Sequence, residues 1–506
     1  MLRSKEEFPF EKLFSNEIKL KLKLLNILYK ESEGLSVDEL ASNISVSQKT
    51  AYKYIKDLNY LSKNFYSKNS ISISSRNNHY TFEGDKIEYL TIRYLIIEKS
   101  DKLQLILALI PNSSVNKYDF CSRYFISEST LKNYIGSINS VFSRLNIHLI
   151  SKKNEIYLIG NEVLIRYCFV SIIWRTYNGL KWPFESILNT SKLLGLRKQV
   201  QGNTGLSIDF GKQDVFITLI AVSIIRFNIS HNISEEQLPL YKDELINSLS
   251  NINELKSSLQ KIFLGDKLEV DFISLNLFLF PEQNMIFSLN ESTLSLLKKK
   301  KKSTFNSCIS FINFFQEKYP NWNIESNRGQ IFIAAVLSAH IATDLYKQAC
   351  FNIQDLNLFA FFSSEFPMLY PSILKITKTF NPTLSSDLLE SLSFHLSKVF
   401  LLDFLPREFE PEINVLVITD SPAYVERGTL FQIKSILRYK YNLKISTKVS
   451  SLEYIDLIIS TGSYTNMPKH IPTIYVFPQI IERDVEIITT AYEKIYKNKI
   501  DKLFFS

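Results

Sequence analysis

The stretch SVDELASNISVSQKTAYKYIKDL, Ser36 to Leu58, decides the fold of this chain, because it holds two short amphipathic segments joined by a turn of three or four residues. Ser36 and Ser47 each stand where a hydroxyl side chain can cap the start of a helix. The apolar residues of the second segment recur at helical spacing on one face, and they are Ala51, Ile55 and Leu58. Two capped helices this close together predict a helix-turn-helix.

The flanking sequence extends this pair into a larger unit. Upstream, Ile18–Lys30 has the apolar spacing of a third helix that can cover the same core. Downstream, Ser70–Ser74 and His79–Gly84 alternate as two strands around a polar tip. Three helices followed by a small hairpin are typical of a winged helix.

The same pattern recurs further along the chain. At a shift of 80 residues, VSQKT (Val46–Thr50) meets ISEST (Ile126–Thr130). At a shift of 76, the strand YTFEG (Tyr80–Gly84) meets IYLIG (Ile156–Gly160). We expect Lys86–Ser100 to be the leading helix of the second unit. An internal repeat of this kind is stronger evidence than a single helix pair.

A capped helix with polar and basic residues on its outer face suits the major groove of DNA, with phosphates near its N-terminus and base edges near its first exposed turns. Lysines and arginines in the wings can bind backbone phosphates. The candidate DNA-binding residues of the first unit are Ser47, Gln48, Lys49, Thr50, Tyr52, Lys53, Lys56, Lys68 and Arg76. Those of the second unit are Ser127, Ser129, Thr130, Lys132, Asn133, Lys152 and Lys153.

The charge distribution agrees with an anionic partner for the N-terminal third. The 506 residues carry a net charge of +8. Residues 1–160 contain 23 Lys and Arg against 17 Asp and Glu, which leaves 36 against 34 for the rest. A basic third on a nearly neutral body favours nucleic acid, although a solvated basic face explains the charge alone as well. The lysine run 298–302 is expected to be a solvated loop, with a secondary contact to DNA flanks or to an acidic partner as the alternative.

The remaining composition describes a protein of the cytoplasm. No signal peptide is visible at the N-terminus, and the apolar runs are too short or too interrupted to span a bilayer. Four scattered cysteines read as reduced core thiols. No phosphate-binding, dinucleotide, zinc-protease or nucleophile-elbow motif occurs, so we expect no enzyme, no cofactor and no metal.

Taken in order, SESTLKNYIGSIN and the segment Gly160–Phe184 resemble the Mga-type virulence regulators of Gram-positive bacteria. The resemblance implies a mainly α protein with tandem winged helix-turn-helix units, two helical regulation domains similar to those of phosphotransferase-controlled regulators, and a C-terminal α/β domain similar to enzyme IIB. The expected boundaries are 1–84, 85–165, 166–290, 291–408 and 409–506.

The resemblance also implies histidines that accept a phosphoryl group in the helical domains. The first domain has Leu219 and Leu279 at those positions. The second has His340 and His395, which makes them candidate phosphorylation sites, although the alternative is that they are core residues. His231 misses both positions and is expected in a loop. In the C-terminal domain, Thr419 stands where the family has a phosphorylated cysteine, so a relay through this domain is not expected.

The sequence therefore predicts a DNA-binding transcriptional regulator, an activator of virulence or surface genes, modulated through its phosphotransferase-regulation-like domains. The expected partners are double-stranded promoter DNA, a second copy of the chain through the C-terminal domain, and the phosphotransferase phosphocarrier protein. Two alternatives remain: an antiterminator-like regulator that binds RNA, and a signalling scaffold whose winged helices bind protein. Steep weakening with salt is expected for DNA binding through several basic residues and not for a protein contact.

Overall fold

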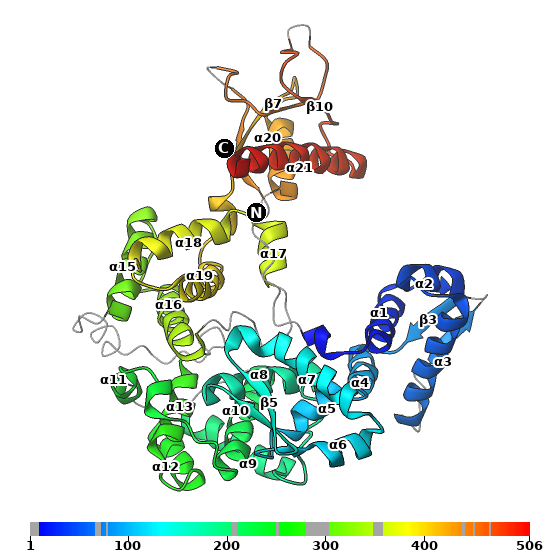
Figure 1. The fold of residues 1–506 in the computed structure, drawn as a ribbon. Helices are drawn as coiled ribbons and strands as arrows, with labels where there is room; N and C mark the ends of the chain where they lie inside the picture. Colours follow the sequence, from blue (N-terminus) through cyan, green and yellow to red (C-terminus); the bar gives the residue numbers. More distant parts are fainter. Residues whose placement is uncertain are drawn as a thin grey trace. The chain divides into compact units, whose positions relative to one another are not determined.

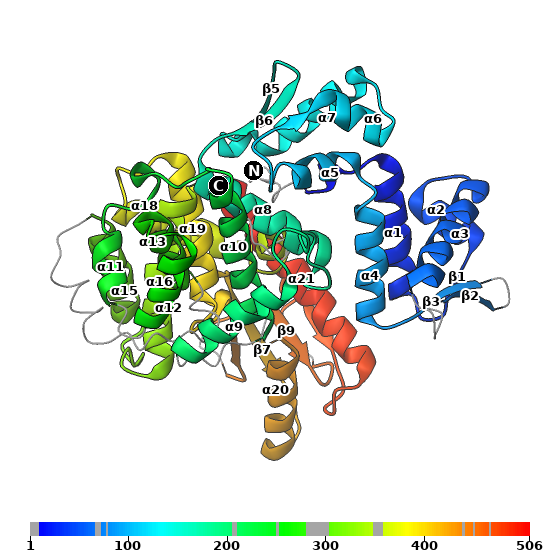
Figure 2. The same ribbon diagram turned by 90° about the horizontal axis from the view of Figure 1, so that it is seen from below.

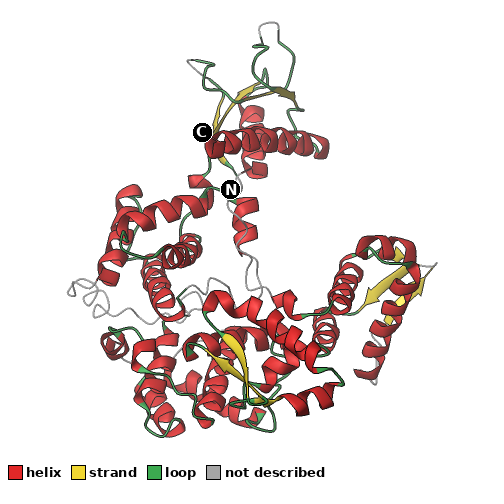
Figure 3. Cartoon of the chain, viewed as in Figure 1, coloured by secondary structure: helices red, strands yellow, loops and turns green. Residues whose placement is uncertain are grey.

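The computed structural model describes residues 10–65, 72–76, 79–204, 210–248, 252–279, 303–347, 358–437, 441–448, 451–464 and 467–505. The chain is mainly helical, with three small sheets (Figures 1 and 3). It forms two compact units, one containing Glu6–Phe305 and His340–Leu356, the other Asn306–Ala339 and Asn357–Ser506.

The first winged helix has the order helix, strand, helix, helix, strand, strand. Its elements are α1 (Asn16–Lys30), β1 (Leu35–Ser36), α2 (Val37–Ile44), α3 (Gln48–Phe65), β2 (Ser72–Arg76) and β3 (His79–Glu83). The sheet order is β1-β3-β2, and both pairs are antiparallel. The short strand β1 adds to the hairpin that the sequence predicts. It was not expected, because two residues are too few to show the alternation of apolar and polar side chains in a strand.

The second winged helix repeats this order and register. Its elements are α5 (Asp101–Ala108), β4 (Val115–Asn116), α6 (Lys117–Tyr124), α7 (Glu128–Phe142), β5 (His148–Lys152) and β6 (Glu155–Ile159), with a short 3₁₀ turn, η2 (Ser143–Leu145), after α7. Leu35 pairs with Tyr80 in the first sheet, and Val115 pairs with Ile156 in the second. The shifts of 80 and 76 residues seen in the sequence are therefore the shifts that align the two sheets.

The expectation for the leading helix of the second unit is wrong. The segment forms α4 (Lys86–Ile97), which contacts α1 and α3 of the first unit, and α1 and α4 lie side by side in Figure 2. Ser100 caps the separate helix α5, which takes the leading place and contacts α7. The aromatic rings of Tyr29 and Tyr89 lie 4.5 Å apart between α1 and α4. The connecting helix thus packs on the first unit, and it also contacts α8 (Glu162–Tyr177).

Between residues 162 and 277, the described part of the chain forms six helices and a short 3₁₀ turn. They are α8 (Glu162–Tyr177), α9 (Thr190–Thr204), α10 (Phe210–Asn228), η3 (Glu235–Gln237), α11 (Lys242–Ser248), α12 (Asn253–Ile262) and α13 (Lys267–Leu277). Leu219 is buried in α10, whereas Leu279 lies in the turn after α13. His231 lies in the loop after α10, as predicted.

Four charged side chains form a network in the core of this helical region. Arg166 donates to Glu162 (Nε to Oε1, 3.1 Å) and to Glu269 (Nη2 to Oε1, 2.8 Å). Arg226 donates to both oxygens of Glu162, at 2.9 and 2.8 Å. Its remaining nitrogen Nη1 donates to the backbone oxygen of Leu109 at 3.0 Å. Since all four charged residues are buried, this network joins α8, α10 and α13 to the end of α5.

A second helical region lies between residues 303 and 409. It contains α15 (Ser303–Lys318), α16 (Asn327–Tyr346), α17 (Leu358–Glu365), α18 (Leu369–Phe380) and α19 (Ser386–Phe400), followed by the 3₁₀ turn η5 (Pro406–Phe409). Aromatic rings fill the core between α15, α16 and α19. Phe315 lies 5.2 Å from Phe404 and 5.5 Å from Phe400, measured between ring centroids. The boundary between the two units falls inside α16.

The C-terminal region is an α/β domain. It contains β7 (Glu412–Ile418), α20 (Ala423–Leu437), β8 (Asn442–Ser446), β9 (Leu457–Ser460), β10 (Thr473–Tyr475) and α21 (Glu482–Phe505). The strands are parallel in the order β10-β9-β7-β8. Ile433 of α20 and Tyr492 of α21 pack in the same cluster as Val415 of β7. Both helices therefore cover one face of the sheet.

Residues of the loops cover the other face of this sheet, where Ile471 packs with Leu416 and Ile458. Thr419, at the carboxyl end of β7, accepts a hydrogen bond from the Thr461 hydroxyl at 2.9 Å. The two loops that follow β7 and β9 are therefore joined at this end of the sheet.

One segment of the described chain, Arg328–Tyr346, has the length and apolar composition of a membrane-crossing helix. It is 72% buried within the protein, and core helices of ordinary domains meet the same criterion. Of the four cysteines, Cys168 and Cys308 are buried, Cys121 is half-buried rather than a core residue, and Cys350 lies outside the described residues.

Candidate nucleic-acid interface

The two recognition helices, α3 and α7, begin with the same cap. The Ser47 hydroxyl accepts a hydrogen bond from the Thr50 backbone N–H at 3.2 Å, and the Ser127 hydroxyl accepts one from Thr130 at 3.1 Å. In each pair the two hydroxyl groups also lie 2.9 Å apart. The capping serines thus satisfy a free N–H of each first turn and fix where each helix starts.

The turn before each recognition helix has the same backbone conformation. Ser45 has a φ of 57° and Phe125 a φ of 53°, and both residues end the preceding helix in the left-handed region. This conformation is uncommon for residues other than glycine, so its recurrence 80 residues later shows that the repeat extends to the backbone.

The buried face of each recognition helix holds it on its own unit. Ala51, Ile55 and Leu58 are buried in α3, and Leu131 and Ile138 in α7. The opposite faces are exposed, as the sequence predicted. Exposed residues are Gln48, Lys49, Tyr52, Lys53 and Lys56 on α3, with Ser129, Lys132 and Asn133 on α7, while Thr50 and Thr130 are half-buried. The ammonium of Lys56 lies 4.8 Å from the centre of the Tyr52 ring, which orients both side chains along the helix.

The wings supply further basic residues. Lys152 and Lys153 are exposed at the tip of the β5–β6 hairpin, where Lys153 and Asn154 have positive φ angles of 47° and 67°. Arg76 ends β2 and pairs with His79 across the first hairpin. Lys68 lies outside the described residues. In the second unit, therefore, the structure brings exposed lysines of the recognition helix and of the wing into one domain.

An N-terminal segment, η1 (Phe10–Leu13), helps to fix α7 in place. The backbone oxygen of Lys12 accepts hydrogen bonds from Lys102 Nζ (3.2 Å) and from the Ser137 hydroxyl (3.3 Å). The Leu13 oxygen accepts one from Ser100 at 2.7 Å. Since α1 follows η1 directly, these bonds connect the two winged units on a second side. The sequence gives no signal for this contact, because its acceptors are backbone atoms.

One exposed residue near this surface was missed by the sequence analysis. Phe125, in the turn between α6 and α7, is 95% exposed. An aromatic ring in this position is available to a partner that approaches the second recognition helix. Its only sequence signal is a large apolar residue at the turn of the repeat.

The two candidate phosphorylation sites lie inside helices and are poorly accessible. His340 is buried in α16. In α19, the Nε2 atom of His395 is buried and has no hydrogen-bond partner within the described part of the chain. Burial holds the pKa of His395 well below its usual range, with a smaller contribution from Lys398. The imidazole of His395 is therefore neutral.

Two winged helix-turn-helix units whose recognition helices expose polar residues and lysines define a DNA-binding regulator. Comparison with known proteins agrees: residues 85–172 match the Mga helix-turn-helix domain, and residues 21–80 match a further helix-turn-helix domain. The chain is therefore a helix-turn-helix transcriptional regulator, and its second winged unit matches the Mga helix-turn-helix domain.

Relatives extend the similarity beyond the winged units. A protein of Streptococcus pneumoniae named "Putative trans-acting regulator" is 22% identical over 466 residues, which cover 88% of this chain and 92% of the relative. The "Capsule synthesis positive regulator AcpB" of Bacillus anthracis is 20% identical over 354 residues, or 68% of this chain and 69% of the relative.

Proposed function

We propose that this protein binds double-stranded promoter DNA through α3 and α7 and activates transcription of virulence or surface genes in the cytoplasm. The cap and turn shared by the two recognition helices, together with the exposed lysines of α3, carry this proposal. The regulators named among its relatives, one of them a positive regulator of capsule synthesis, support the activating role.

DNA binding is tested by a mobility-shift titration on promoter and random duplexes at two salt concentrations. We expect the affinity to fall steeply with salt, because each neutralised phosphate releases counterions. Replacing both Lys49 and Lys53 by alanine should reduce the salt slope by about two and weaken binding to all sequences. The matched control replaces Lys434, on α20 of the C-terminal domain, by alanine.

Three outcomes would contradict this proposal. Absence of a shift even at low salt would favour a scaffold that binds protein. Tighter binding to single-stranded RNA than to duplex DNA would favour the antiterminator alternative. Equal losses in the Lys434→Ala control and in the double variant would remove α3 from the interface.

We also propose that His395 or His340 accepts a phosphoryl group from the phosphotransferase phosphocarrier protein. A neutral imidazole nitrogen is the required nucleophile, and the unbonded Nε2 of His395 meets this condition. Because this atom is buried, α19 must open before a donor protein reaches it. Opening of α19 is thus the step at which phosphorylation would control the regulator.

Incubation with the phosphocarrier protein and its phosphoryl donor, followed by intact mass spectrometry at neutral pH, tests this idea. We expect one added phosphoryl group that is lost on brief acid treatment and is absent from the His395→Gln variant. If His340→Gln abolishes the signal instead, the acceptor is His340. Retention of the signal in the variant that lacks both histidines would rule the proposal out.

The C-terminal domain is proposed to join two copies of the chain. Tyr424 and Phe431 are 78% and 72% exposed, and they are seven residues apart on one face of α20. Phe431→Glu is expected to shift the protein from dimer to monomer in sedimentation-velocity runs, because a carboxylate would lie in the apolar contact. The control is Tyr454→Glu, at an aromatic residue with 72% exposure outside α20. Equal dissociation in both variants would argue against a contact through α20.

A further inference from the structure

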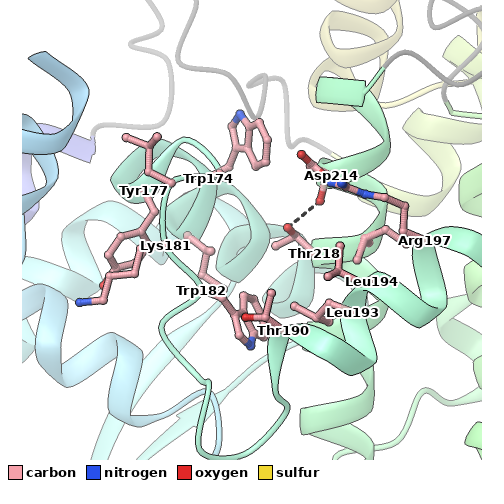
Figure 4. A pocket seen from close by; sticks show the side chains of 14 residues that line it. Trp174, Tyr177, Lys181, Trp182, Thr190, Leu193, Leu194, Arg197, Asp214 and Thr218 are labelled. Atoms are coloured by element: carbon pink, nitrogen blue, oxygen red, sulfur yellow. Dashed lines mark hydrogen bonds and ion pairs between the residues drawn. The ribbon is translucent and has the colours of Figure 1, made fainter. Parts of the chain in front are cut away.

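A pocket of about 220 Å³ lies within the first helical region, between the C-terminal end of α8, the turn that follows it, α9 and α10 (Figure 4). Two indole rings, those of Trp174 and Trp182, contribute to its wall, and half of its other lining residues are leucine, isoleucine or tyrosine. The Trp182 nitrogen Nε1 donates to the Leu188 oxygen at 2.7 Å, which holds this ring in place. Apolar walls with a few polar groups are typical of small-molecule sites.

The polar side chains that line the pocket are those of Lys181, Thr190, Arg197, Asp214 and Thr218, together with the Tyr177 hydroxyl. Arg197 and Asp214 form an ion pair across α9 and α10. The Thr218 hydroxyl donates to the backbone oxygen of Asp214 at 2.7 Å, and all three residues gather on one side of the pocket in Figure 4. A guanidinium beside a carboxylate presents a donor and an acceptor next to each other. This corner therefore suits a ligand edge that also carries both a donor and an acceptor.

The charges of the pocket are already balanced. Arg197 pairs with Asp214, and the ammonium of Lys181 lies 2.6 Å from Glu98 in a second ion pair. A charged ligand would have to break one of these pairs. An uncharged ligand keeps both, so neutrality of the ligand follows from the arrangement.

The positions of the polar groups in the pocket favour one of two classes of uncharged ring compound over the other. A monosaccharide carries hydroxyl groups all around its ring, and most of them would face leucine and isoleucine side chains without a partner. A planar heterocycle has apolar faces and polar atoms only at its edge. Its faces fit the indoles by stacking, and its edge fits the corner at Arg197 and Asp214. The volume, about that of seven water molecules, suits one or two fused rings.

We propose that this pocket binds an uncharged planar heterocycle of the size of a purine base. The wall of the pocket also contacts the end of α4, the helix that packs on the first winged unit. The Tyr177 hydroxyl and the Lys181 ammonium both donate to the carboxylate of Glu98, which directly follows α4, at 2.9 and 2.6 Å. The ligand would therefore lie one side chain away from the helix that packs on the first winged unit.

The tryptophans of the chain can report ligand binding in the pocket. Two of the three line the pocket, and the third, Trp322, lies in the other unit. The 506-residue chain is labelled with 5-fluorotryptophan, and its three ¹⁹F resonances are assigned with single Trp→Phe variants. Adenine and hypoxanthine are the probes, with glucose and adenosine monophosphate as comparison compounds. We expect saturable shifts of the Trp174 and Trp182 resonances with the bases, and no shift of Trp322.

The variant Thr218→Met should fill the pocket and weaken binding of the bases by about tenfold or more. Thr379→Met is the matched control, because this threonine also bonds to the backbone oxygen four residues earlier but lies on α18. No shift with either base at about 1 mM, the weak limit of specific binding, would overturn the proposal. So would equal shifts of all three resonances, or a response to glucose or to the charged nucleotide instead of the bases. None of these results would affect the DNA-binding assay.

Discussion

The variant Glu162→Gln is expected to lower the free energy of unfolding by about 3–5 kcal/mol for the compact unit that contains both winged helices. Glu162 is the carboxylate that Arg166 and Arg226 share in the buried charge network. Glutamine keeps the size of the side chain but removes its charge, which leaves two buried guanidinium groups opposite the single carboxylate of Glu269. A buried charge that loses its partner is costly because it is no longer compensated in a medium of low dielectric constant.

Chemical denaturation followed by tryptophan fluorescence measures this loss, since Trp174 lies on α8. The control is Asp243→Asn, which breaks an exposed pair with Lys267 (2.6 Å) and should cost at most about 1 kcal/mol. The double variant Glu162→Gln, Arg226→Gln removes one charge of each sign and should lose less than the sum of the single variants. If Glu162→Gln is as mild as Asp243→Asn, the network does not hold α8 to α10.

The second large effect concerns Glu410, which links the last helical region to the α/β domain. Its Oε1 accepts a hydrogen bond from the Met368 N–H at 3.0 Å, and its Oε2 accepts one from the Tyr496 hydroxyl at 2.6 Å. Burial raises the pKa of Glu410 to about 7, and the hydrogen bonds only partly oppose this shift. The folded protein therefore keeps a proton at Glu410 under conditions in which the unfolded chain releases it.

This shift has a defined consequence for stability. Below pH 4.5, the ordinary pKa of a glutamate side chain in water, both states carry the proton and Glu410 contributes no pH dependence. As the pH rises from there to about 7, only the unfolded state loses the proton, so the free energy of unfolding falls, by about 3 kcal/mol over this window.

Glu410→Gln is expected to remove this fall. Glutamine can accept from the Met368 N–H with its oxygen and donate to the Tyr496 oxygen with its amide. The difference in unfolding free energy between variant and parent, measured at intervals from pH 4.5 to 8, should therefore grow with pH in favour of the variant. Glu412→Gln, at the exposed start of β7, is the control and should leave the slope unchanged. Parallel curves for Glu410→Gln and the parent would show that folding does not shift the pKa of Glu410.

Local sequence was sufficient for the winged units because their signals lie close together in the chain. Each capping serine, Ser47 or Ser127, accepts a hydrogen bond from an N–H group only three residues later in the sequence. The apolar spacing of α3 is likewise visible within a single segment. Lys86–Ser100, expected as the leading helix of the second unit, instead forms α4 and the cap of α5. Periodicity shows that a segment is a helix but not which neighbour it packs against, and α4 packs on the first unit rather than the second.

What the sequence by itself determined is the tandem repeat, its exposed basic faces and hence the class of regulator. The tertiary structure alone decided which distant residues meet. Glu269 reaches Arg166 across 103 positions, Glu410 reaches Tyr496 across 86, and the two tryptophans share a pocket with residues of α9 and α10. Such contacts depend on how the helices pack. The sequence alone does not show whether a charged side chain is buried with a partner or exposed to water.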